Sequence, residues 1–163
     1  MIVGREKEIE FLKGLLEEEE SQFVAIYGRR GIGKTFLIRE TFNYSFAFQH
    51  TGIYGASLKE QLSEFTESLY SAGMRKVKEL PSNWNEAFHL LERFIEKSKD
   101  TQKKKIIFID EMPFSRAMTS FAFMPRIKAQ TPLVLPSQPP MNWASCTFPS
   151  SSTLIQMYLE QVP

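Results

Sequence analysis

The chain has 163 residues, enough for about one domain with its own core, and 42% of them are hydrophobic. A formal net charge of +1 gives no electrostatic reason to expect a nucleic acid or a membrane surface as partner, and the single Cys146 excludes an internal disulfide framework. The N-terminus MIVGREKEIEF lacks an apolar signal region, and no run approaches the roughly 18 to 20 apolar residues of a spanning helix, so we expect a cytoplasmic protein without a membrane partner.

The first predicted elements alternate between helix and strand. Apolar residues recur at helical spacing over residues 6–20, with acids and lysines on the other face. The β-branched and aromatic run QFVAIYG, residues 22–28, predicts a strand. A second helix is expected to begin directly after GIGKT, residues 31–35.

The same alternation continues to residue 111. Residues 45–55 predict a strand closed by glycines, and residues 57–73 a helix with Ser57 as N-cap and Glu60 three residues later. Residues 82–99 predict another amphipathic helix with a stripe of large apolar side chains, and KKKIIFIDE, residues 103–111, a fully apolar strand. Helices that alternate with strands predict an α/β fold with a parallel sheet covered on both faces.

The composition changes abruptly near residues 112–114. Residues 1–111 hold 35 of the 39 charged residues and all eight glycines, whereas residues 112–163 hold four charged residues and eight of the nine prolines. The run LVL is enclosed by prolines, and only residues 151–162 could form a regular element, of ambiguous type. We predict an ordered segment over 1–114 and a Pro/Ser-rich tail over 115–163 that is out of frame or disordered; a genuine Pro/Ser-rich extension is the alternative.

The motif GRRGIGKT matches the phosphate-binding pattern G-x-x-x-x-G-K-[ST] in full. A strand enters it and a helix leaves it, so its backbone N–H groups can surround a phosphate at a helix N-terminus. Lys34 would place a positive charge on the β- and γ-phosphates, and the Thr35 hydroxyl would be a ligand of Mg²⁺. The expected phosphate-binding residues are Gly28, Arg29, Arg30, Gly31, Ile32, Gly33, Lys34 and Thr35. The competing interpretation is a glycine-rich turn that only caps a helix.

Two acids follow the third predicted strand. An apolar strand in the sheet interior delivers Asp110 to its carboxyl edge, where ligands bind in open α/β sheets. Asp110 would hold the Mg²⁺ shell, and Glu111 would orient or polarise an attacking water. We therefore predict Thr35 and Asp110 as the metal residues, and Lys34 and Glu111 as the catalytic ones.

Together, VGREKEIEFL, YGRRGIGKTFLI and KKIIFIDEMPF resemble the archaeal-type P-loop ATPases of the AAA+/STAND group, over about residues 1–113. The resemblance implies a three-layer α/β/α P-loop fold, with ATP and Mg²⁺ as cofactors. It also implies that Val3, Gly4 and Arg5 border the adenine; an ordinary helix N-terminus is the alternative. Arg29 and Arg30 either touch phosphates or are solvated.

Relatives of this kind continue after the acidic strand with a helix, a strand that ends in a polar sensor residue, a further strand and a helical lid with arginines. None of these can be recognised after Glu111, so we expect an incomplete domain whose C-terminal strands and lid are missing. The resemblance places the sensor strand between the P-loop strand and the acidic strand. Without it, buried backbone groups of two apolar strands would lose their partners, at about 1 to 3 kcal/mol each.

The leading interpretation is a truncated ATPase that binds Mg–ATP through its Walker A loop and whose ancestor hydrolysed ATP to drive a conformational switch. Binding is expected to persist because the loop is local, whereas hydrolysis lacks the arginine and sensor groups that stabilise the transition state. The alternatives are a non-catalytic nucleotide-binding module, an inactive fragment, and a P-loop kinase. The sequence indicates no nucleic-acid partner and leaves open a homo-oligomer or a protein effector.

Overall fold

The computed structural model describes residues 4–18, 22–97, 105–111, 133–136 and 153–159. Its helices are α1 (Glu6–Gly14), α2 (Lys34–Thr41), α3 (Leu58–Ser71) and α4 (Trp84–Lys97). Its strands are β1 (Gln22–Gly28), β2 (Phe48–Thr51), β3 (Ile107–Asp110), β4 (Leu133–Pro136) and β5 (Thr153–Leu159). None of these described helices combines the length and apolar character that crossing a bilayer requires.

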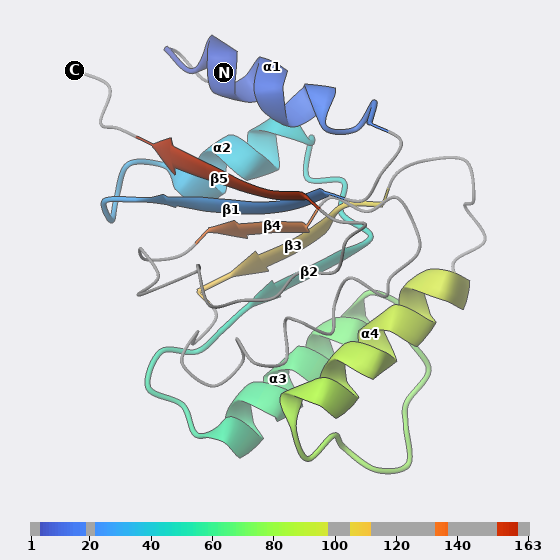
Figure 1. Cartoon of the computed structure of the whole chain (residues 1–163). Helices are drawn as coiled ribbons and strands as arrows, with labels where there is room; N and C mark the ends of the chain where they lie inside the picture. Colours follow the sequence, from blue (N-terminus) through green and yellow to red (C-terminus); the bar gives the residue numbers. More distant parts are fainter. Residues whose placement is uncertain (1–3, 19–21, 98–104, 112–132, 137–152, 160–163) are drawn as a thin grey trace.

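The strands form one parallel sheet in the order β2-β3-β4-β1-β5. Figure 1 shows α1 and α2 on one face of the sheet and α3 and α4 on the other. The predicted three-layer α/β/α class with a parallel sheet is therefore confirmed. Because the strands are parallel, all their carboxyl ends lie at the same edge, which is where α2 begins.

The expectation that the C-terminal strands are missing is wrong. Strand β4 lies between β3 and β1, in the register Phe23↔Leu133 on one side and Ile107↔Leu133 on the other. Strand β5 pairs with β1 along its whole length, from Gln22↔Thr153 to Gly28↔Leu159. Both stretches come from residues 115–163, the segment predicted to be an out-of-frame or disordered tail. The sheet therefore has its middle member, and the backbone groups of β1 have partners on both sides.

Two core clusters explain why the interior strands carry few polar residues. Along β1, Phe23 and Ala25 face the cluster under α3 and α4, while Val24 and Ile26 face the cluster under α1 and α2. Strand β3 divides in the same way, with Ile107 and Ile109 on one side and Phe108 on the other. Strands buried on both faces read as continuous apolar runs, as parallel strands between helical layers do.

The helices of the second layer follow their sequence signals. Helix α3 begins with the predicted capping box, in which the Ser57 hydroxyl accepts from the Glu60 N–H and the Glu60 carboxylate accepts from the Ser57 N–H. Trp84 of α4 stacks on Phe88 at 5.6 Å between ring centroids and meets Phe65 of α3 edge-on at 5.5 Å. Trp84 is therefore a packing residue, and the apolar stripe predicted for this helix is buried.

Candidate nucleotide-binding site

The loop between β1 and α2 has the backbone that its glycines permit. Gly31 and Gly33 have φ values of 86° and 83°, in the left-handed region that other residues adopt only with strain. A Cβ at either position would meet no atom within 4 Å, so the requirement for glycine comes from the backbone angle rather than from space. Gly33 is the N-cap of α2 and supplies no side-chain cap, which leaves the first N–H groups of the helix without a side-chain acceptor.

The side chain of Lys34 folds back over the loop between β1 and α2. Its ammonium donates hydrogen bonds to the carbonyl oxygens of Gly28 at 2.9 Å and Arg29 at 3.0 Å. These bonds hold the positive charge above the backbone that connects β1 to α2. The neighbouring Arg29 and Arg30 are exposed.

Thr35 and Asp110 meet although they are 75 residues apart in the sequence. The Thr35 hydroxyl, in the first turn of α2, donates a 2.7 Å hydrogen bond to the carboxylate of Asp110, the last residue of β3. Asp110 is 6% exposed, and burial raises its pKa above the usual value, while the Thr35 hydrogen bond opposes that rise and the Glu111 charge adds to it. The predicted pair of metal residues is thus brought together, and its hydroxyl and carboxylate oxygens are ligands that Mg²⁺ prefers.

Glu111 follows Asp110 at the carboxyl edge of β3 and is exposed. Its φ of 52° lies in the left-handed region, which is uncommon for a residue with a long side chain. The chain therefore turns sharply as it leaves the strand, and the two successive acids lie in different environments, one buried and one in solvent. Among the described residues, Glu111 forms no side-chain hydrogen bond or ion pair with the P-loop.

The side chain of Arg5 contacts the P-loop. Its guanidinium is buried and donates to the Ile32 carbonyl at 3.3 Å and to the Glu8 carboxylate at 3.2 Å. Gly4, with a φ of 78°, donates its N–H to the Glu6 carboxylate at 3.2 Å. Through Arg5, the segment before α1 is attached to the phosphate loop. Val3 lies outside the described residues, and the predicted adenine contacts stay predictions.

Arg39 is a residue near the site that the sequence analysis missed. Its guanidinium lies 5.7 Å from the centre of the Phe108 ring, and its charge lowers the pKa of Asp110, as the weakest of the influences on that group. Its Nε is buried and has no hydrogen-bond partner among the described residues. A signal was available, because Arg39 follows Thr35 by four residues and so lies on the same face of α2.

Comparison with known proteins assigns the class. The sequence model of one protein family, an ATPase domain predominantly from Archaea, matches residues 2–123, well over half of the chain. The chain therefore belongs to this archaeal-type ATPase family, as the resemblance predicted, and the match runs past residue 113. An uncharacterized ATP-binding protein of Methanocaldococcus jannaschii is 42% identical over 40 residues, which is 24% of this chain and 68% of that protein.

Solved structures agree with the fold. The Drosophila origin recognition complex bound to DNA contains a chain that superposes with a TM-score of 0.63 at 18% identity, covering 99% of this chain and 44% of that one. Cdc6 of Pyrobaculum aerophilum gives 0.59 at 15% identity, covering 96% and 46%. A STAND protein with a tetratricopeptide-repeat sensor from Pyrococcus horikoshii gives 0.52 at 22%, covering 96% and 23%. This chain thus spans less than half the length of each of these three.

Proposed function

We propose that the chain binds Mg–ATP at the loop Gly28–Thr35. The observation that supports this most strongly is the 2.7 Å hydrogen bond between Thr35 and Asp110, which joins the end of the phosphate-binding motif to the acid at the edge of β3. A glycine-rich turn that only caps a helix would give no reason for a buried carboxylate with a raised pKa beside it. The relative from Methanocaldococcus jannaschii is named as an ATP-binding protein, which agrees with the proposal.

The phosphates would bind to the start of α2. Its first N–H groups carry the positive end of the helix dipole and have no side-chain cap. The Lys34 ammonium, bound to two loop carbonyls, would exchange these partners for phosphate oxygens at little conformational change. Charge-assisted hydrogen bonds of this kind are worth about 1.5 to 3 kcal/mol each.

Thr35 and Asp110 would hold Mg²⁺, which neutralises charge on the phosphate oxygens when it is bound. The cation would favour the ionised form of Asp110 and so offset the burial that raises its pKa. Glu111, exposed at the same edge, would orient a water for attack on the terminal phosphate. Hydrolysis by this chain is the further step of the proposal, and a nucleotide-binding module without hydrolysis is its alternative.

Two assays separate these functions. We expect the fluorescent analogue mant-ATP to bind the wild-type chain and the control Lys13→Ala, whose exposed side chain lies on α1, and to bind Lys34→Ala roughly 10- to 100-fold more weakly. Absence of binding by the wild type would indicate an inactive fragment. Phosphate release that is lost in Glu111→Gln, with mant-ATP binding retained, would support hydrolysis; binding without release would support the non-catalytic module.

A further inference from the structure

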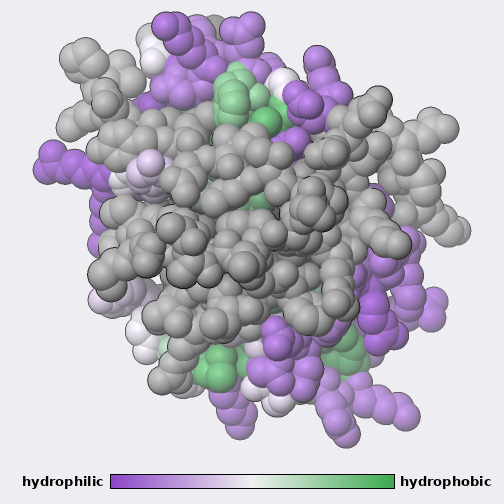
Figure 2. Space-filling view, in the orientation of Figure 1, coloured by the Kyte–Doolittle hydropathy of each residue, from purple (hydrophilic) through white to green (hydrophobic). Residues whose placement is uncertain are grey.

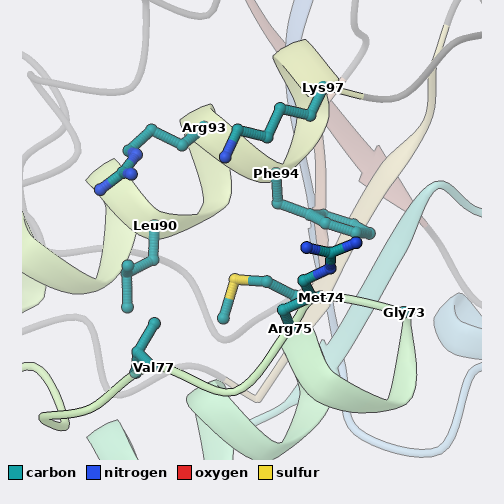
Figure 3. Close-up of a pocket in the computed structure, with 8 residues that line it drawn as sticks. All are labelled: Gly73, Met74, Arg75, Val77, Leu90, Arg93, Phe94 and Lys97. Atoms are coloured by element: carbon teal, nitrogen blue, oxygen red, sulfur yellow. The ribbon is translucent and has the colours of Figure 1, made fainter.

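A cavity lies on the opposite side of the sheet from α2. It has a volume of about 530 Å³ and lies between the second half of α4 and the chain that follows α3. Its apolar lining consists of four partly buried side chains: Met74, Val77, Leu90 and Phe94. Figure 3 shows Met74 and Val77 from the chain after α3 and Leu90 from α4 pointing into the same space. We refer to this cavity as the α3–α4 pocket.

One wall of the pocket, the chain that follows α3, is fixed by a tight turn and two hydrogen bonds. Gly73, with a φ of 104°, ends α3 and turns the chain back. The Met74 N–H then donates to the Leu69 carbonyl at 3.0 Å, and the Val77 N–H donates to the Tyr70 hydroxyl at 3.3 Å. The backbone of Met74 and Val77 is therefore fixed before any ligand binds, which lowers the cost of ordering this wall of the pocket.

The rim of the pocket is positively charged. Arg75, Arg93 and Lys97 line it and are exposed, and no carboxylate lines it in the described part of the chain. Arg93 and Lys97 are four residues apart on α4, so they lie on one face of the helix. None of the three forms an ion pair with another described residue. The molecule as a whole has a net charge of only +1, so this cluster is a local feature.

We propose that the α3–α4 pocket binds an acidic peptide segment of another protein, with one apolar side chain in the cavity and its carboxylates on the three cations. The cations are spread over a helix and a neighbouring chain segment, which suits several charges along a peptide better than one carboxylate. Three of the four apolar lining residues are aliphatic, which suits an aliphatic anchor, whereas single-stranded nucleic acid is held by stacking on aromatic platforms. Figure 2 shows hydrophilic side chains gathered where α4 lies, at the lower right of the view.

The test is a fluorescence anisotropy titration of the full chain. The probe is a labelled peptide in which one Leu is flanked by runs of Glu; the comparison probes are the same peptide with Gly in place of Leu, and a labelled single-stranded oligonucleotide. We expect the wild type to bind the Leu peptide, and the Arg93→Glu/Lys97→Glu double variant to bind it about tenfold or more weakly. The control Lys13→Glu, an exposed cation on α1, is expected to bind within about twofold of the wild type.

Other outcomes would overturn the proposal. Failure of the wild type to bind the Leu peptide, or equal binding by the double variant at an unchanged melting midpoint, would remove the pocket as an acidic-peptide site. Equal affinity for the Gly peptide would show that the cavity takes no anchor. Tighter binding of the oligonucleotide, with the same dependence on Arg93 and Lys97, would identify a nucleic-acid surface instead.

Discussion

His50 makes the stability of the fold depend on pH. Its ring, on β2, is buried against the rings of Phe48 and Phe65. Its Nδ1 lies 2.9 Å from the Ser68 hydroxyl, and its Nε2 has no hydrogen-bond partner among the described residues. Burial lowers the pKa of His50 from 6.5 to about 4. Below its unfolded pKa, the unfolded chain binds a proton at this position that the folded chain excludes. The stabilising effect of burying neutral His50 is therefore complete above the unfolded pKa and is lost as the pH falls toward the folded one.

The magnitude follows from the two pKa values. A pKa unit is worth about 1.4 kcal/mol, so the interval from 6.5 to about 4 corresponds to about 3 kcal/mol in full. We expect urea unfolding to show about 2.5 kcal/mol of this loss between roughly pH 7.5 and roughly pH 4.5. The carboxyl groups also titrate over this range, so the quantity to compare is the loss in the wild type minus the loss in His50→Phe.

The matched control is His89→Gln. His89 is a partly exposed histidine of α4 that lies 3.1 Å from the Glu92 carboxylate, so its removal takes away a histidine without emptying the buried site. This control is expected to lose stability on acidification nearly as much as the wild type does. If His50→Phe loses as much stability as the wild type, the burial of a neutral His50 is not the cause and the reasoning is refuted.

Three further predictions concern the fold and are checked by urea or thermal unfolding. Phe65→Ala removes a fully buried ring that contacts four other rings, and should lower the free energy of unfolding by about 3 to 5 kcal/mol; a loss below about 1 kcal/mol would contradict the described core. Ser57→Ala breaks the capping box of α3 and should lower the free energy of unfolding by about 1 kcal/mol. Ser71→Ala, at the other end of α3, should change the free energy of unfolding by less than about 0.5 kcal/mol. A chain that ends at residue 132 loses β4 and β5 and should not unfold cooperatively; an unchanged midpoint would show that the two strands contribute nothing.

The P-loop half of the fold could be predicted because its signals are local. The residues of GRRGIGKT fix the loop, the capping box fixes the start of α3, and a strong apolar stripe fixes the buried face of α4. Element ends were less predictable: the first helix was expected to run to residue 20, but α1 ends at Gly14. The expected strand over 45–55 is confined to Phe48–Thr51, where its neighbour β3 offers backbone partners.

The two C-terminal strands could not be predicted from their own residues. Strand β4 has only four residues and ends in Pro136, which has no N–H to donate to a neighbour. Strand β5 carries no pattern that separates strand from helix. Both are defined by what lies beside them, since β1 and β3 present backbone groups on which a short extended segment can pair. Sheet pairing of this kind is a tertiary effect and leaves little trace in the local sequence.

The origin of residues 115–163 stays a prediction, because the pairing of β4 and β5 shows what two of its segments do and not how the segment arose. Reading the underlying nucleotide sequence in the other two frames tests the idea of an out-of-frame tail. A continuation of the ATPase pattern in one of those frames would support it, and its absence from both would contradict it.

Within the site, the sequence predicted that Thr35 and Asp110 would lie together. It did not predict the contacts of the two neighbouring arginines, Arg5 and Arg39. The Thr35–Asp110 contact was expected from the motif and the sheet edge. The hydrogen bonds of the Arg5 guanidinium to the Ile32 carbonyl and to Glu8 were not predicted, because they depend on how α1 packs against the loop. The predicted adenine contact of Arg5 stays a prediction. Arg39 was missed because its relation to Asp110 passes through the packing of α2 on β3, which the spacing from Thr35 only suggests.

The most direct test of the proposed Mg–ATP site is the effect of Mg²⁺ on nucleotide affinity, measured by calorimetric titration of ATP into the full chain. The wild type is expected to bind ATP at least about tenfold more tightly with Mg²⁺ than with EDTA. The variants Asp110→Asn and Thr35→Ala are expected to lose most of this difference and to keep the weaker affinity that is measured with EDTA. An equal Mg²⁺ dependence in the wild type and both variants would contradict the assignment of Thr35 and Asp110. A wild-type chain that binds no ATP under either condition would contradict the proposed function itself.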